Sequence, residues 1–114
     1  MKDDSVYLRH VAESIARIRN YTSRGHETFV AEAIVQDAVI RNLEVVGEAV
    51  KRISDSTRLK APQIPWKQIA GMRDVLIHNY FGVQLDRVWQ VVERDLPPLE
   101  AAVADLLAQA DKPP

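Results

Sequence analysis

The sequence contains no cysteine, so disulfide bonds and thiolate metal sites are excluded. Its four glycines form no phosphate-binding glycine motif. Residues 75–85 form the longest stretch without Asp, Glu, Lys or Arg, which is too short to span a bilayer. The start, residues 1–4, lacks the apolar run of a secretory signal. We therefore expect a cytoplasmic protein with no membrane segment.

Helical periodicity accounts for most of the chain. We predict one helix over residues 4–22, where apolar side chains recur at helical spacing, and Gly25 after its end. A longer helix is predicted over residues 28–54, with Thr28 as its N-cap. Its apolar residues occupy more than one side, which favours a central helix in a bundle or a contact with another subunit.

The second half of the chain predicts a loop and two further helices. Residues 55–64 have no apolar period, and Pro65 suits the first turn of a helix that ends near His78 or Asn79. Asp86 is the expected N-cap of the last helix, and Pro97 with Pro98 should kink or split it. The expected fold is an all-α, up-and-down four-helix bundle, a single domain over residues 1–114, with a kinked or split C-terminal helix.

The densest group of reactive side chains lies in residues 73–80. Asp74 and His78 are four residues apart, so on a helix they share a face and can form a carboxylate–imidazole hydrogen bond. Arg73 lies about 140° around the helix from His78, so only its long side chain can bring the guanidinium near the imidazole. Tyr80 follows two residues after His78.

This combination suits the cleavage of a phosphodiester. Imidazole exchanges protons near neutral pH, and guanidinium holds phosphate through paired hydrogen bonds. RNA carries its own nucleophile, the 2′-hydroxyl, so such cleavage needs no metal and no cofactor. Arg73 and His78 are therefore candidate catalytic residues, and Asp74 and Asn79 are candidate supporting residues; the resemblance described below implies the catalytic roles of Arg73 and His78. The negative end of a helix dipole would favour protonated His78 as a general acid. The alternative is that these residues have structural roles only, with Arg73 in a surface ion pair and His78 capping the end of a helix.

Charge is unevenly distributed around this motif. The net charge is −1, which argues against indiscriminate binding to nucleic acid. Residues 51–73, however, carry six basic side chains against one acidic. Lys51, Arg52 and Lys67 are candidates for steering an RNA backbone toward the motif, although a solvated basic loop explains the same pattern.

The carboxylates of Glu44 and Glu48, four residues apart on a predicted helix, are a candidate pair of metal ligands. Such a site in a helical bundle normally includes a Glu-x-x-His motif, and the chain has none. Arg41 and Arg52 lie one turn away and can pair with the two carboxylates. We expect no metal.

The motif and its flanks resemble the HepT-like branch of the HEPN superfamily. The resemblance rests on three blocks in order: residues 41–52, residues 64–72, and Arg73-x4-His78-x-Tyr80. It extends over residues 4–109. It implies an all-helical, homodimeric ribonuclease, the toxin of a type VII-like toxin–antitoxin pair. It also implies a minimal nucleotidyltransferase antitoxin of the MntA type, which transfers AMP from ATP to the motif tyrosine, here Tyr80, and blocks cleavage of tRNA or mRNA.

Two other functions remain open from the residues. The chain could be a non-catalytic helical module that binds a nucleotide or a nucleotidyltransferase partner, for which an intact Arg–His pair would be unnecessary. It could also be a structural dimeric bundle assembled through its broad apolar helix.

Overall fold

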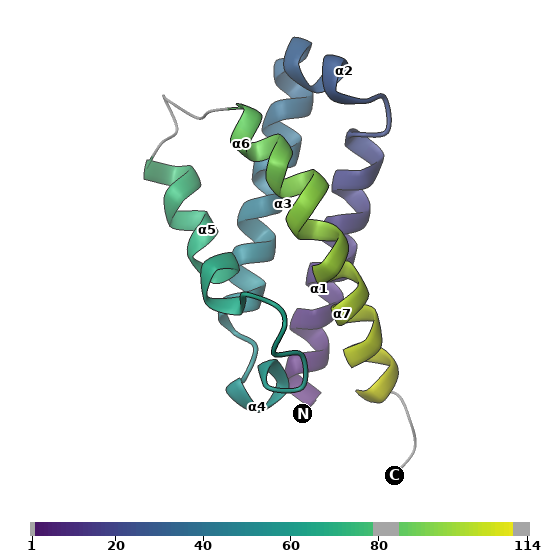
Figure 1. Ribbon diagram of the computed structural model, residues 1–114, viewed down its shortest axis with the longest axis vertical. Helices are drawn as coiled ribbons and strands as arrows, with labels where there is room; N and C mark the ends of the chain where they lie inside the picture. Colours follow the sequence, from purple (N-terminus) through teal and green to yellow (C-terminus); the bar gives the residue numbers. More distant parts are fainter. Residues whose placement is uncertain (1, 79–84, 111–114) are drawn as a thin grey trace.

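The computed structural model describes residues 2–78 and 85–110, with side chains described for residues 4–72 and 85–110. Four helical columns run alternately up and down (Figure 1). The second column packs against both the first and the third, and the fourth packs against the first. The start of the first helix and the end of the last lie at the same end of the bundle. The predicted all-α bundle is confirmed.

The elements follow one another with short connections. The first half of the chain contains α1 (Lys2–Tyr21), α2 (His26–Ala31) and α3 (Ala33–Lys51). The second half contains the short α4 (Asp55–Arg58), α5 (Trp66–His78), α6 (Leu85–Gln90), a π-helical segment η2 (Val91–Asp95) and α7 (Leu96–Ala110). No described helix has both the length and the apolar composition needed to cross a membrane.

The core lies between α1, α3, α5 and the α6–α7 column. The helical spacing that predicted α1 is the spacing of its buried face, because Leu8, Val11, Ile15 and Ile18 are all at most 2% exposed. Facing them are apolar side chains of the other helices, among them Val39, Leu43, Val46, Val50, Leu99 and Val103. The helix α3 packs against both α1 and α5, as expected for the central helix of a bundle.

The single helix predicted over residues 28–54 is wrong, because the chain breaks at Glu32. Its backbone is extended there, with φ −115° and ψ 111°. The side-chain amide of Gln36 donates hydrogen bonds to the carbonyl oxygens of Phe29 and Val30, each at 3.0 Å, and so satisfies groups at the end of α2. The Phe29 ring is fully buried, which holds α2 across the end of the bundle.

The start of α2 also differs from expectation. Thr28 lies inside α2 and is not its N-cap. Gly25, with φ 93°, occupies the left-handed region that glycine adopts readily and separates α1 from α2. His26 is the first residue of α2, and the centre of its ring lies 5.0 Å from that of Trp89.

The predicted interruption near Pro97 is confirmed and takes the form of the π-helical segment. Neither Pro97 nor Pro98 has an N–H, so neither can donate to a carbonyl in the preceding turn. Just before them the register widens by one residue, and the Leu96 N–H donates to the Val91 carbonyl. The prolines then occupy the first turn of α7, where a missing N–H costs least. Asp86 lies in the first turn of α6, which begins one residue earlier at Leu85.

Candidate functional site: the outer face of α5

The start of α5 is fixed by Trp66. Its indole is 6% exposed, and its Nε1 donates to the carbonyl oxygens of Ala61 at 2.9 Å and Arg58 at 3.1 Å. This pairing ties the loop before α5 to its first residue, with Pro65 immediately ahead. Trp66 is therefore a core anchor.

The helix α5 has an inner and an outer face. Trp66 and Ile69 are buried toward α3, whereas Lys67 and Gln68 are exposed. Position 73 follows Ile69 by four residues and Trp66 by seven, which places it on the inner face by helical register. The predicted phosphate-holding position therefore belongs to the face of α5 that carries the core residues.

Position 78 belongs to the outer face. It follows Lys67, Gly71 and Asp74 by eleven, seven and four residues, and these separations return to nearly the same azimuth. We call this row the outer strip, defined as Lys67, Gly71, Asp74 and His78. His78 is the last residue of α5, so it stands at the negative end of the helix dipole. Positions 73 and 78 are about 140° apart around the axis and about 7.5 Å apart along it.

The predicted motif is therefore only partly placed. Arg73, Asp74 and His78 lie on one helix in the expected register, but their side-chain contacts lie outside the described part of the structure. Asn79 and Tyr80 lie outside the described residues altogether. The catalytic, supporting and modification roles of these residues remain predictions.

The candidate RNA-binding residues gather at the far end of α5 from His78. Lys51 is the last residue of α3, Arg52 follows it and Lys67 lies in the first turn of α5, and all three side chains are exposed. The end of α3 and the start of α5 lie at the same end of the bundle (Figure 1). Lys67 and His78 are about 16 Å apart along the helix. Arg52 is also engaged locally, since its Nη2 lies 3.6 Å from Glu48 Oε1. An RNA contacting both ends would have to run along α5.

One cation of the basic segment has a structural role. The Arg58 guanidinium donates through Nη2 to the Val50 carbonyl at 2.7 Å and so satisfies a carbonyl at the end of α3. Its Nε is buried and has no hydrogen-bond partner. The local net charge therefore overstates the number of cations that can reach a ligand.

A groove between α1 and α3 was missed by the sequence analysis. It encloses about 380 Å³ and is lined by the following residues of the two helices: Tyr7, His10, Arg41, Glu44, Val45, Glu48, Ala49 and Arg52. The rings of Tyr7 and His10 meet edge to face at 6.4 Å. Helical spacing placed each set on one face of its own helix but carried no signal that the two faces would adjoin.

The two glutamates of that groove pair with arginine. Arg41 Nη1 lies 3.7 Å from Glu44 Oε2, and Glu48 pairs with Arg52 as stated above. Among the described residues, no group of three or more His, Asp or Glu side chains could hold a metal ion. The paired carboxylates are thus accounted for as partners of neighbouring arginines.

Comparison with known proteins finds one matching family model and several relatives. The family model described as ribonuclease HepT-like matches residues 11–106. A protein of Thermococcus cleftensis named "Probable ribonuclease HepT" is 43% identical over 95 residues, which cover 82% of this chain and 86% of that protein. A Caldanaerobacter subterraneus protein named as a candidate RNase is 39% identical over 111 residues, or 94% of this chain and 96% of its own.

A longer relative shows the same similarity within a larger protein. It is a Methanocaldococcus jannaschii protein named as a gamma-glutamylcyclotransferase and candidate RNase, 43% identical over 112 residues. These cover 97% of this chain, which spans about half the length of that protein. No solved structure matches the chain. A family model that spans most of the bundle, with two relatives that align over 86% and 96% of their own length, shows that this chain belongs to the HepT-like ribonuclease family.

Proposed function

We propose that this chain is a metal-independent endoribonuclease that cleaves RNA through attack by the 2′-hydroxyl. The observation that carries the proposal is membership of the HepT-like ribonuclease family together with positions 73 and 78 lying on one helix, α5. Guanidinium and imidazole supply charge stabilisation and proton transfer, which are the two needs of phosphodiester cleavage.

The reaction is a transesterification that consumes no water. A base removes the proton of the 2′-hydroxyl, the 2′-oxygen bonds to phosphorus, and the bond from phosphorus to the 5′-oxygen breaks. His78 gives a proton to the leaving 5′-oxygen, and Arg73 neutralises the charge that develops on the phosphate. Asp74 and Asn79 orient these two groups. The products are a 2′,3′-cyclic phosphate and a free 5′-hydroxyl, and no cofactor takes part.

The proposed biological role is that of a toxin in a type VII-like toxin–antitoxin pair. Its substrate would be tRNA or mRNA in the cytoplasm, and its partner a minimal nucleotidyltransferase of the MntA type. That partner would transfer AMP from ATP to the Tyr80 hydroxyl with release of pyrophosphate, and so block the site. A homodimer would set two motifs beside one cleft, which suits a motif whose arginine and histidine positions occupy different faces of α5.

A defined RNA tests the catalytic proposal. The substrate is an oligonucleotide in which all sugars but one are 2′-deoxy, so that cleavage occurs only at the single ribonucleotide. Arg73→Ala and His78→Ala should each abolish cleavage, whereas EDTA should leave it unchanged. The cyclic phosphate end is identified by mass spectrometry, and far-UV circular dichroism checks that each variant remains helical.

Matched controls come from α1. His10→Ala and Arg17→Ala remove an exposed imidazole and an exposed guanidinium away from α5 and should cleave like the wild type. Cleavage retained by His78→Ala or Arg73→Ala would refute the assigned roles. Loss of cleavage on chelation would refute the metal-independent mechanism.

A further inference from the structure

Gly71 occupies a helix position that no described residue requires to be glycine. It lies in the interior of α5, where glycine is less favourable than alanine because it orders a more flexible backbone. A Cβ built at position 71 meets no atom of the described residues within 4 Å, so packing against these residues does not forbid a side chain. Gly25 is the one described glycine with positive φ, so backbone conformation does not call for glycine at position 71 either.

The position of Gly71 suggests what does require it. It lies at the centre of the outer strip, about 6 Å along the axis from Lys67 and about 10 Å from His78. The outer strip therefore has the Lys67 cation at one end and the proposed proton donor, His78, at the other. Gly71, which has no side chain, lies between them. Lys67 is exposed, so its ammonium is available to a ligand on this face.

We propose that Gly71 is the point at which the RNA strand approaches α5 most closely, and that it positions the scissile phosphate. This inference rests on the proposed endoribonuclease function. The sugar–phosphate chain next to the cleaved bond passes over the bare backbone at Gly71, and the Lys67 ammonium holds a phosphate farther along the strand. Backbone groups inside a helix already bond to one another, so the glycine supplies clearance, not hydrogen bonds.

The space above Gly71 matters because the cleavage rate depends on where the scissile phosphate lies relative to His78. A methyl group at position 71 would lift the strand from the helix and move the phosphate relative to His78. A displacement of about 1 Å at a reacting centre can lower a rate roughly 100-fold. The RNA strand would thus lie along the face of α5 opposite the core, with Gly71 as a positioning residue. Position 73 lies on the inner face, so the Arg73 guanidinium would reach the phosphate along its long side chain or from the second subunit of the proposed homodimer.

The test is cleavage of the single-ribonucleotide substrate by Gly71→Ala and Gly71→Gln. We expect kcat/KM to fall roughly 10- to 100-fold in Gly71→Ala and further in Gly71→Gln, as a graded steric effect. Binding is measured separately with the all-deoxy oligonucleotide, which is not cleaved. Lys67→Ala should lower the slope of log K against log salt by about 0.7, the value for one phosphate contact on a single strand.

A second variant distinguishes the steric effect of the methyl group at position 71 from the loss of helix flexibility when glycine is replaced. In Gln68→Gly/Gly71→Ala, glycine is restored at a neighbouring exposed position while the methyl group at position 71 remains. If the methyl group blocks the strand, the double variant stays impaired, and Gln68→Gly alone cleaves like the wild type. Recovery of cleavage in the double variant would overturn the proposal in favour of a flexible helix.

The remaining outcomes are also decisive. Wild-type rates in Gly71→Ala and Gly71→Gln would overturn the inference while leaving the nuclease intact. A change of oligomeric state in Gly71→Ala, measured by light scattering, would show that a second copy of the chain covers Gly71 and would equally overturn it. Equal cleavage by the wild type and His78→Ala would instead mean that the proposed function has failed.

Discussion

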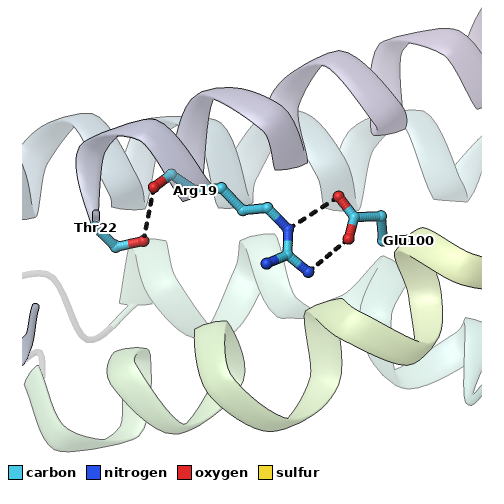
Figure 2. Close-up of polar contacts among 3 residues, drawn as sticks. All are labelled: Arg19, Thr22 and Glu100. Carbon is cyan, nitrogen blue, oxygen red and sulfur yellow. Dashed lines mark hydrogen bonds and ion pairs between the residues drawn. The ribbon is translucent and has the colours of Figure 1, made fainter.

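Arg19 on α1 and Glu100 on α7 form a two-point ion pair that joins the first and last helices of the bundle. Arg19 Nε donates to Glu100 Oε2 at 2.9 Å and Nη2 donates to Oε1 at 2.5 Å, so the planar guanidinium faces both carboxylate oxygens (Figure 2). Hydrogen bonding to Glu100, assisted by the charge of the carboxylate, raises the pKa of Arg19. The Thr22 hydroxyl also approaches the Arg19 carbonyl, at 3.4 Å.

We expect this pair to contribute modestly to stability. The two side chains are 54% and 39% exposed, so water screens their attraction, and exposed pairs typically contribute about 0.2–1 kcal/mol. A double-mutant cycle of Arg19→Ala and Glu100→Ala, followed by urea unfolding, should give a coupling energy in that range that shrinks in 1 M salt. A coupling that is zero at low salt would show that the pair does not hold α7 against α1.

A buried carboxylate is expected to make stability depend on pH. Asp4 is 5% exposed and accepts hydrogen bonds from the Ser54 N–H at 3.1 Å, the Ser54 hydroxyl at 2.6 Å and the Thr57 hydroxyl at 2.5 Å. Burial alone would raise the pKa of Asp4, but the hydrogen bonds from Ser54 and Thr57 outweigh it, so the pKa is lowered. Asp4 thus joins α1 to α4.

Because the pKa of Asp4 is lowered on folding, the free energy of unfolding should fall as the pH falls. A carboxyl whose folded pKa lies below its unfolded value, about 3.9, stabilises the fold fully above that value. The contribution is lost as the pH falls toward the folded pKa. Asp4→Ala should cost about 2–3 kcal/mol at pH 7 through the lost charged hydrogen bonds, and the difference from wild type should narrow below pH 4. Urea unfolding from pH 7 to pH 2.5 measures it, and a difference that is constant with pH would contradict the assignment.

Gly71→Ala should stabilise the protein even if it impairs cleavage. Alanine is favoured over glycine inside a helix by about 1 kcal/mol, and the added methyl group meets no atom of the described residues within 4 Å. The melting temperature should therefore rise by roughly 4 °C. Thermal unfolding followed by circular dichroism measures the change, and a lower melting temperature would mean that the site is strained.

Tyr80 should carry AMP after coexpression with a neighbouring nucleotidyltransferase gene. Each transferred AMP adds a fixed mass and at least one negative charge, which would repel an RNA backbone from the end of α5. Intact-protein and peptide mass spectrometry would locate the addition, with Tyr80→Phe as the unmodifiable control. An unmodified Tyr80 in cells that are protected from growth inhibition would contradict the proposed regulation.

The order of amino acids was sufficient to predict the bundle and the helix that carries the motif. The apolar spacing that predicted α1 and α5 matches the buried face of each helix, because a helix in a bundle buries a single apolar stripe and residue spacing alone determines that stripe. The same geometry placed Arg73 and His78 about 140° apart on α5. The missing N–H of Pro97 predicted an interruption of the last column, which lies just before it, at Val91–Asp95.

Packing between distant segments decided the rest. The break at Glu32 depends on Phe29 filling the core and on Gln36 bonding back to α2, and both follow from how α2 meets the bundle end. The bonds from Asp4 to Thr57 and from Arg19 to Glu100 join residues 53 and 81 positions apart, which no local period can predict. Local spacing determines which face each helix presents, whereas only the packed bundle determines what that face meets.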